Sequence, residues 1–212
     1  MNLPRIYPIL DTNALASQGL SLETAAAAVL EGGATLLQLR HKAHWSREIC
    51  AAAEAVAGLC QQAGAQLIVN DRADFAMLFS AGLHLGQDDL APSDARRLLG
   101  NSAIVGYSCH SAAQISAARV EPVDYVALGP IFATASKQNP DPVLGVDQLR
   151  FCRTLLDRPL VAIGGITLEN AAGILRAGAD SVAILSGVIP QLASLSALRA
   201  RMEQWLQLAA TV

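Results

Sequence analysis

The feature that most constrains the fold is the order of apolar segments along the chain. Short runs rich in Val, Ile and Leu alternate with Ala-rich stretches whose apolar residues recur at helical spacing. A strand followed each time by a helix gives a parallel sheet with helical crossovers. Eight such units favour a closed (β/α)8 barrel, a TIM barrel, over the alternative of an open doubly wound sheet. The predicted strands are Arg5–Asp11, Thr35–His41, Gln66–Asp71, Leu83–Gly86, Ala103–Ser108, Tyr125–Ile131, Pro159–Ile166 and Ser181–Ser186.

The segments between these strands carry helix signals. Serines stand where helices should begin and glycines where they should end, at Ser21, Ser46, Ser111, Gly32, Gly64 and Gly178. The predicted helices are Leu22–Glu31, Arg47–Gln62, Pro92–Leu99, Ala112–Arg119, Val146–Leu156, Leu168–Arg176 and Ser194–Leu208. No linker, low-complexity tract or charge block divides the chain, so we expect residues 1–212 to form a single domain.

Composition narrows the partners. The net charge is −3 and the basic residues are scattered, so neither nucleic acid nor a membrane surface is an expected partner, whereas a small phosphorylated substrate is compatible. The four cysteines form no C-x-x-C pair, which favours reduced thiols over a zinc site. Because no apolar run has the length of a signal peptide or membrane span, we expect a cytoplasmic protein; a homo-oligomer stays open.

In a TIM barrel the functional side chains lie where the strands end at their carboxyl termini, and polar residues are concentrated there. Gln38, Arg40 and Lys42 are spaced two apart and therefore share one side of the second strand, whereas Leu37 and Leu39 face the other. Buried cations require anionic partners. Two readings are equally favoured by the spacing: an anionic ligand, or ion pairs with Asp or Glu at the strand ends.

Two acids follow neighbouring strands. Asp71 ends the third strand and Asp89 follows the fourth, so the two carboxylates should converge. They would repel each other without a cation between them, and hard oxygen ligands suit Mg²⁺. Taken singly, each acid has a structural explanation: Asp71 could pair with Arg72, and Asp89 could cap the helix that begins near Pro92.

The fifth strand brings Ser108 to the same edge. No strained Gly-x-Ser-x-Gly turn surrounds it, so we expect a hydrogen-bonding serine rather than a nucleophile. The histidines lack metal-ligand spacing, and each is expected to be a core or surface residue. They are His41, His44, His84 and His110.

The later strands are followed by two features typical of ligand binding. Residues 132–145 form a long connection that carries Thr134, Ser136 and Lys137, and a loop of this length favours a lid over the site. Gly164 and Gly165 end the seventh strand, where TIM barrels commonly bind phosphate through backbone N–H groups.

With these positions marked, the chain closely resembles the thiamine phosphate synthase family from the first strand to the eighth. The shared motifs occur in the same order, and six in register are very specific. They are Gln38–Lys42, Asn70–Asp74, His84–Asp89, Gly106–His110, Gly129–Lys137 and Gly164–Ile166.

The resemblance implies a reaction and a role for each motif. Hydroxymethylpyrimidine diphosphate would lose diphosphate, and the nitrogen of a thiazole phosphate, or of its carboxylated form, would attack the resulting pyrimidine methylene cation. The pyrimidine diphosphate would be held by Gln38, Leu39, Arg40, His41, Lys42, Asn70, Ser108 and Lys137, of which Arg40, Lys42, Ser108 and Lys137 are the implied catalytic residues. Mg²⁺ would be bound by Asp71 and Asp89. The thiazole phosphate would be held by Thr134, Ala135, Ser136, Gly165, Leu185 and Ser186.

Two alternatives use the same barrel. A thiazole tautomerase shares the thiazole phosphate site but uses a histidine near the end of the sixth strand, where this chain has Gly129 and Pro130. A non-catalytic phosphate-binding barrel would not require a metal opposite two cations. Asp88 is the alternative to Asp89 as a ligand, because the two acids are adjacent.

Overall fold

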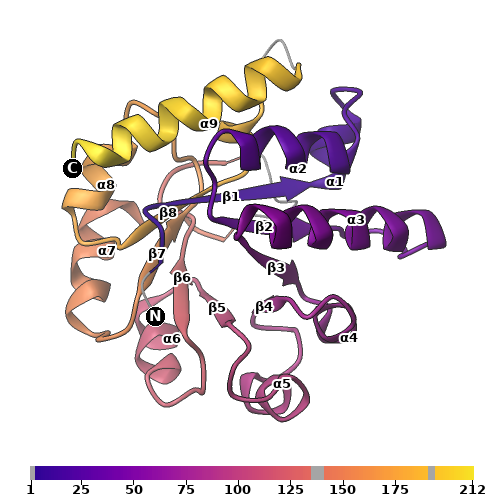
Figure 1. Ribbon diagram of the computed structural model, residues 1–212. Coiled ribbons are helices and arrows are strands. Elements are labelled where there is room, and N and C mark those ends of the chain that lie inside the picture. The colour runs from indigo at the N-terminus through magenta and orange to yellow at the C-terminus, as the bar shows by residue number, and fades with distance from the viewer. Residues whose placement is uncertain (1–2, 135–140, 191–193) are drawn as a thin grey trace.

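The computed structural model describes residues 3–134, 141–190 and 194–212. Within these residues eight parallel strands close into a barrel, in which each strand pairs with its sequence neighbours and the last pairs with the first (Figure 1). This confirms the TIM barrel over the open sheet. The strands are β1 Ile6–Asp11, β2 Leu36–Arg40, β3 Gln66–Asn70, β4 Gly82–Leu85, β5 Val105–Cys109, β6 Tyr125–Leu128, β7 Leu160–Ile163 and β8 Ser181–Ile184.

Helices surround the strands in Figure 1. They are α1 Thr12–Ala16, α2 Leu22–Glu31, α3 Arg47–Ala63, α4 Ala73–Leu78, α5 Pro92–Leu99, α6 Ala112–Ala118, α7 Gly145–Thr154, α8 Ala171–Arg176 and α9 Leu195–Ala210, with the 3₁₀ turn η1 Ser186–Val188. The sequence analysis missed α1 and α4, because helices of five and six residues are too short to show a helical period. It also placed the start of α8 three residues too early, at Leu168.

The expected capping residues occur at the predicted helix boundaries. The hydroxyls of Ser21, Ser46 and Ser111 each accept a hydrogen bond from the backbone N–H three residues on. At the other end, Gly32 and Gly64 are the C-caps of α2 and α3. These caps satisfy backbone groups that the first and last helical turns leave without partners.

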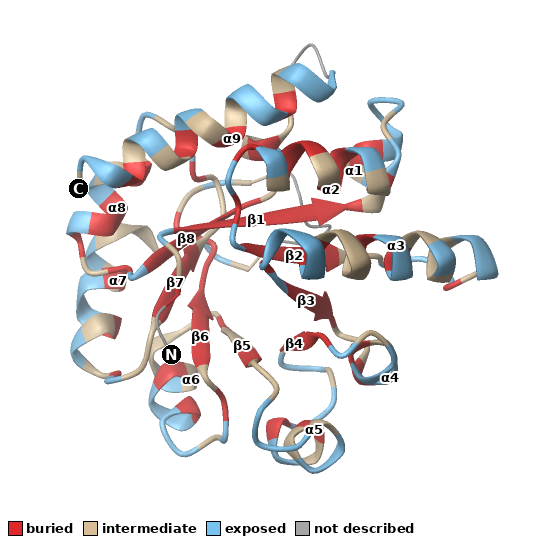
Figure 2. Cartoon of the chain, viewed as in Figure 1, coloured by how far each residue is buried: buried red, intermediate tan, exposed pale blue. Residues whose placement is uncertain are grey.

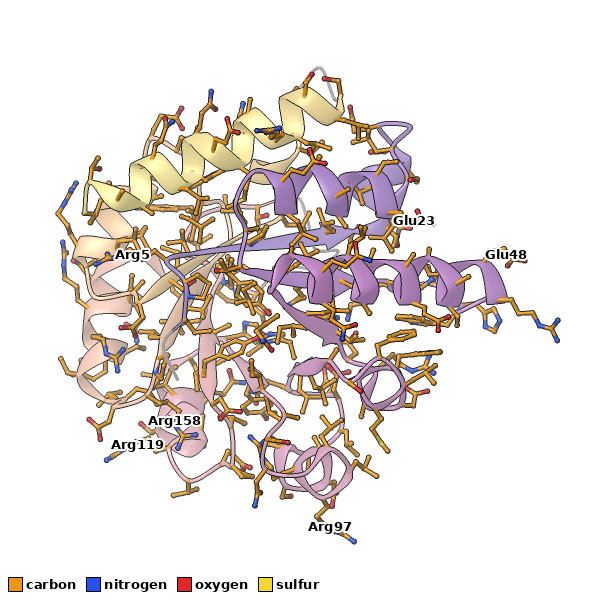
Figure 3. The ribbon with its side chains drawn as sticks, viewed as in Figure 1. Arg5, Glu23, Glu48, Arg97, Arg119 and Arg158 are labelled. Carbon is orange, nitrogen blue, oxygen red and sulfur yellow. The ribbon has the colours of Figure 1, made fainter. Side chains whose placement is uncertain are left out.

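Side chains on the two faces of the sheet enter different cores. Those that face outward, such as Leu37 and Leu39, pack against the helices in the larger apolar cluster. Those that face inward, such as Ile9 and Ile68, form a second apolar cluster with Tyr7 inside the barrel. Figure 2 shows the strands as buried and the outer helix surfaces as exposed. In Figure 3 the labelled charged side chains Glu48 and Arg97 point away from the molecule at its periphery.

All four cysteines are present as free thiols, three of them buried. Among the described residues, no helix combines the length and the apolarity that crossing a membrane requires.

Candidate active site

A cavity of about 520 Å³ opens at the carboxyl ends of the strands. Most of the residues that the sequence analysis selected line it, as expected for a TIM barrel. They are Gln38, Arg40, Lys42, Asn70, Asp71, Asp89, Ser108, Thr134, Gly165, Leu185 and Ser186. Three further selected residues, Ala135, Ser136 and Lys137, lie outside the described part of the chain.

On β2 the predicted alternation holds, and the reading of its cations as ion-paired is observed, whereas an anionic ligand stays a prediction. Arg40 and Lys42 line the cavity, yet each also forms an ion pair. The Arg40 guanidinium binds the buried carboxylate of Asp11, at the end of β1, and Lys42 Nζ lies 2.5 Å from Asp71 Oδ2. The cations are therefore held at the cavity edge by acids from the adjacent strands.

Two members of the same motif do not reach the cavity. The Leu39 side chain packs against the helices in the larger apolar cluster, and its backbone pairs with β1 and β3. His41 Nδ1 lies 2.7 Å from Thr12 Oγ1, and its ring packs edge-on against Trp45. Neither residue is among those that line the cavity, and their contact with the pyrimidine diphosphate stays a prediction.

The two acids converge as predicted, and neither has its alternative structural partner. Arg72 pairs with Asp74 rather than with Asp71. The N-cap of α5 is Ala91, without a side-chain cap, and the Asp89 carboxylate instead accepts a hydrogen bond from the Gly86 N–H at 2.6 Å. Asp71 adopts a left-handed backbone conformation, with φ of 66°, which is uncommon outside glycine and is frequently found at functional sites.

The electrostatics of this pair fit a divalent cation. Burial and the neighbouring Asp71 carboxyl raise the pKa of Asp89, against the opposing effects of the Gly86 N–H and the Lys42 charge. Two close carboxylates in this state are stabilised by a hard cation between them. Within the described residues no group of three or more His, Cys, Asp or Glu is arranged to hold a metal ion. Asp88 also lines the cavity, but it is Asp89 that interacts with Asp71.

The floor of the cavity contains a buried hydrogen-bond chain that the sequence analysis missed. Gln38 Nε2 donates to the Tyr7 hydroxyl, which lies 2.8 Å from the Tyr125 hydroxyl. His84 links Tyr125 to Ser108, with 2.9 Å from Nδ1 to the phenol oxygen and 2.9 Å from Nε2 to Ser108 Oγ. Burial lowers the pKa of His84 to about 4, so its ring is neutral. Alternation along β1 and β4 turns Tyr7 and His84 toward the barrel interior, and this pattern is the signal by which the sequence could have identified them.

Asn70, at the end of β3, lines the cavity beside this chain. Its Nδ2 is buried and has no hydrogen-bond partner in the described residues. Because an unpaired buried amide costs free energy, an acceptor on a ligand is the expected partner.

At the opposite side of the cavity, the β7 loop lies directly against residues 130–133. A Cβ at Gly164 would stand 2.6 Å from Pro130 Cβ, and one at Gly165 would stand 2.6 Å from the Ala133 carbonyl. Both glycines have positive φ, so neither position accepts another residue without strain. Leu185 and Ser186, from the end of β8, line the same region. This is the place where TIM barrels bind phosphate.

His110 also lines the cavity, although the sequence analysis expected it to be a core or surface residue. Its Nδ1 donates to the Gly129 carbonyl at 2.6 Å and lies 3.5 Å from Asp141 Oδ2. A histidine from β5 therefore lies beside the end of β6.

Comparisons with known proteins agree on one family. The family described as thiamine monophosphate synthase matches residues 6–188. A thiamine-phosphate synthase from Koribacter versatilis is 45% identical over 193 residues, 89% of this chain and 90% of that protein. One from Azorhizobium caulinodans is 42% identical over 184 residues, 86% of each chain. The structure of a thiamine phosphate pyrophosphorylase from Pyrococcus furiosus has a TM-score of 0.82 at 28% identity, covering 98% of this chain and 96% of that one.

Proposed function

We infer, from the premise that the chain belongs to the thiamine monophosphate synthase family, that it is a transferase that condenses a pyrimidine with a thiazole phosphate. Its substrates are small phosphorylated molecules. The products are thiamine phosphate and diphosphate. The observation that carries this conclusion is the meeting of Asp71 and Asp89 with Lys42 and Arg40 around one cavity, because a leaving diphosphate needs both metal ligands and cations.

The diphosphate end of the substrate belongs at the β2, β3 and β4 strand ends. Arg40 and Lys42 are placed to bind its oxygens as negative charge develops on the leaving group. Two unit charges about 4 Å apart interact by up to about 4 kcal/mol at an effective dielectric near 20. Solvent screening reduces this for Lys42, whose side chain is 45% exposed.

Asp71 and Asp89 are the proposed holders of Mg²⁺. A bound divalent ion supplies charge neutralisation for the departing diphosphate. The chain's own contribution is to keep two carboxylates close together, one fixed by Lys42 and the other by the Gly86 N–H. The same contacts orient the carboxylates when no ion separates them.

The pyrimidine ring belongs on the floor of the cavity, against Gln38, Asn70 and Ser108. The thiazole phosphate belongs opposite, at the β7 and β8 loops, with Thr134, Gly165, Leu185 and Ser186. Lys137, Ala135 and Ser136 keep the roles that the family resemblance implies: the first with the diphosphate, the other two with the thiazole.

Among the described residues, the cavity floor offers no strong protein nucleophile, which supports a dissociative reaction. Ser108 does contact a histidine, but the pKa of His84 is lowered to about 4 and such a ring is a poor general base near neutral pH. Departure of diphosphate before attack by the thiazole nitrogen requires no base at this position. The role of the protein is then to orient the two substrates and to exclude water.

The tautomerase alternative is weaker. His110 lies beside Gly129, close to where that activity places its histidine. However, isomerising a thiazole gives no use to the Asp71 and Asp89 pair.

The decisive assay mixes the purified protein with 4-amino-2-methyl-5-hydroxymethylpyrimidine diphosphate, thiazole phosphate and Mg²⁺. We expect thiamine phosphate and diphosphate in equal amounts, and loss of both products when EDTA is added. Isomerisation of a carboxylated thiazole without coupling would instead establish the tautomerase. Running the assay with plain and carboxylated thiazole phosphate identifies the natural acceptor.

We also propose that residues 1–212 act as one catalytic domain in the cytoplasm. The free, mostly buried cysteines support the cytoplasmic location, because free thiols are typical of reducing compartments.

A further inference from the structure

A chain of side-chain hydrogen bonds crosses the barrel interior and connects residues from five strands. Its links are Gln38 Nε2 to Tyr7, Tyr7 to Tyr125, Tyr125 to His84 Nδ1, and His84 Nε2 to Ser108, with distances between 2.8 and 2.9 Å. The first four members are buried, and only Ser108, at the end of the chain, is partly exposed.

The hydrogen atoms in this chain can be counted. Each hydroxyl carries one hydrogen, and burial raises the pKa of both tyrosines, so both stay protonated. Tyr7 accepts from the Gln38 amide, and among the described residues its own hydrogen has no acceptor other than the Tyr125 oxygen, so we take Tyr7 as the donor to Tyr125. Tyr125 then donates to His84 Nδ1. The neutral His84 ring must carry its hydrogen on Nε2, which donates to Ser108.

The direction of the chain decides what its two ends offer to a ligand. Because Nε2 of Gln38 is used by Tyr7, its Oε1 is left as an acceptor, with no other hydrogen bond among the described residues. Because the Ser108 oxygen accepts from His84, its hydroxyl hydrogen is left as a donor. Asn70 adds a second donor through its unpaired Nδ2. Of these groups, Gln38 Oε1 is an acceptor, and the Ser108 hydroxyl hydrogen and Asn70 Nδ2 are donors.

We propose that this buried chain selects an aminopyrimidine over the corresponding pyrimidinone by fixing which end of the floor accepts and which donates. An aminopyrimidine has an exocyclic amine that donates and ring nitrogens that accept, which complements the Gln38 acceptor and the Ser108 and Asn70 donors. A pyrimidinone has a carbonyl that accepts and a ring N–H that donates, so its carbonyl would face the Gln38 oxygen, which is also an acceptor. Accepting it would require turning the Gln38 amide and moving every hydrogen along the chain.

This proposal deepens the proposed function and rests on it, since it assigns the cavity floor to the pyrimidine. Tyr7, Tyr125 and His84 act as positioning residues, through the side chains at the two ends. Gly106 is part of the device, because a Cβ there would stand 2.0 Å from Tyr125 Cζ. The absence of a side chain at Gly106 gives the Tyr125 ring its place between Tyr7 and His84.

The first test is spectroscopic and needs no substrate. Long-range ¹H–¹⁵N NMR of the free protein distinguishes the two neutral histidine tautomers, and the signals of His84 are assigned by their loss in His84→Asn. We expect the hydrogen on Nε2. A hydrogen on Nδ1 would mean that the chain runs in the opposite direction and would overturn the proposal.

The second test measures discrimination. The amine 4-amino-2-methyl-5-hydroxymethylpyrimidine diphosphate and its 4-oxo counterpart are compared by competition for binding. In the wild type the oxo compound should bind roughly 10- to 100-fold more weakly, the effect of leaving buried groups mispaired. Tyr125→Phe removes the central hydroxyl and should reduce this ratio by about 10-fold. The matched control is Tyr107→Phe, because Tyr107 faces the outer apolar cluster and has no part in the chain.

The outcomes separate cleanly. A folded Tyr125→Phe protein that keeps the wild-type ratio would overturn the proposal; if that variant does not fold, Tyr7→Phe cuts the next link and serves the same purpose. If the wild type binds neither pyrimidine and forms no thiamine phosphate, the proposed function fails while the tautomer of His84 is still measured.

Discussion

Replacing Gly106 by alanine tests whether the buried chain of hydrogen bonds has the tight packing described. The added Cβ would stand 2.0 Å from Tyr125 Cζ and 2.3 Å from its hydroxyl oxygen, whereas carbon atoms in contact are about 3.5–4.0 Å apart. Since Gly106 does not have a positive φ, alanine is allowed by the backbone and the effect is purely steric. The fully buried Tyr125 ring must therefore move by roughly 1.5 Å.

This displacement has a calculable cost. Overpacking a core costs about 1–3 kcal/mol. Tyr125 would also lose its hydrogen bonds to Tyr7 and His84, at about 1 kcal/mol each. Alanine recovers about 0.4–1 kcal/mol by restricting the unfolded chain. The net expectation is a loss of about 3 kcal/mol from the free energy of unfolding, a large share of the roughly 5–15 kcal/mol typical of a domain.

Urea denaturation of the wild type and Gly106→Ala measures this directly. Gly58→Ala is the control, because Gly58 lies inside α3 with nothing within 4 Å of an added Cβ, and alanine there should stabilise by about 0.5–1 kcal/mol. In a Tyr125→Ala background the Gly106 substitution should cost little, since the obstructing ring is gone. An unchanged unfolding midpoint for Gly106→Ala, or an equal cost in both backgrounds, would refute the steric reasoning.

Three further outcomes are expected. Burial lowers the pKa of His84 to about 4 in the folded state, so the unfolded state binds a proton first as the pH falls. The free energy of unfolding should therefore fall by about 3 kcal/mol between pH 6.5 and pH 4. In His84→Gln the free energy of unfolding should change less over the same pH range. Asp71→Asn should lower kcat/KM at least about 100-fold and raise the Mg²⁺ concentration needed for half-maximal rate, whereas Asp74→Asn, which only frees the exposed Arg72, should behave as wild type; equal rates for the two variants would remove Asp71 from the metal site. Lys137→Ala should slow the chemical step, followed by rapid quench, more than it weakens thiazole binding, and an unchanged chemical step would exclude Lys137 from the leaving-group site.

The sequence predicted the barrel because its periodicity is local. Each strand and its helix carry their own apolar pattern and caps, and a repeat of eight such units has few other ways to bury its faces. Where that local signal was short, the prediction failed. The helices α1 and α4 have five and six residues, about one and a half turns each. Such short helices depend on tertiary packing, which α1 has with β1 and α2, and α4 has with β3, β4 and α5.

The sequence also predicted which strand-end residues meet, because alternation along a strand fixes the side to which each points. It selected Asp71 and Asp89 as a pair, and Gln38, Arg40 and Lys42 as one inward row, and the structure brings all of them to one cavity. The alternation of β2 also turned Leu39 away from the cavity, and only the family motif as a whole included it.

By itself, then, the sequence determined the fold and the edge of the barrel where the cavity opens, since both follow from local periodicity and from the types of residue at strand ends. Only the tertiary structure decided which side chains contact each other. Arg40 pairs with Asp11, Lys42 pairs with Asp71, and the Tyr7 and Tyr125 hydroxyls are hydrogen-bonded although 118 positions separate them in the sequence. Such contacts depend on closure of the barrel, which brings inward side chains of distant strands together in a volume that no local pattern describes.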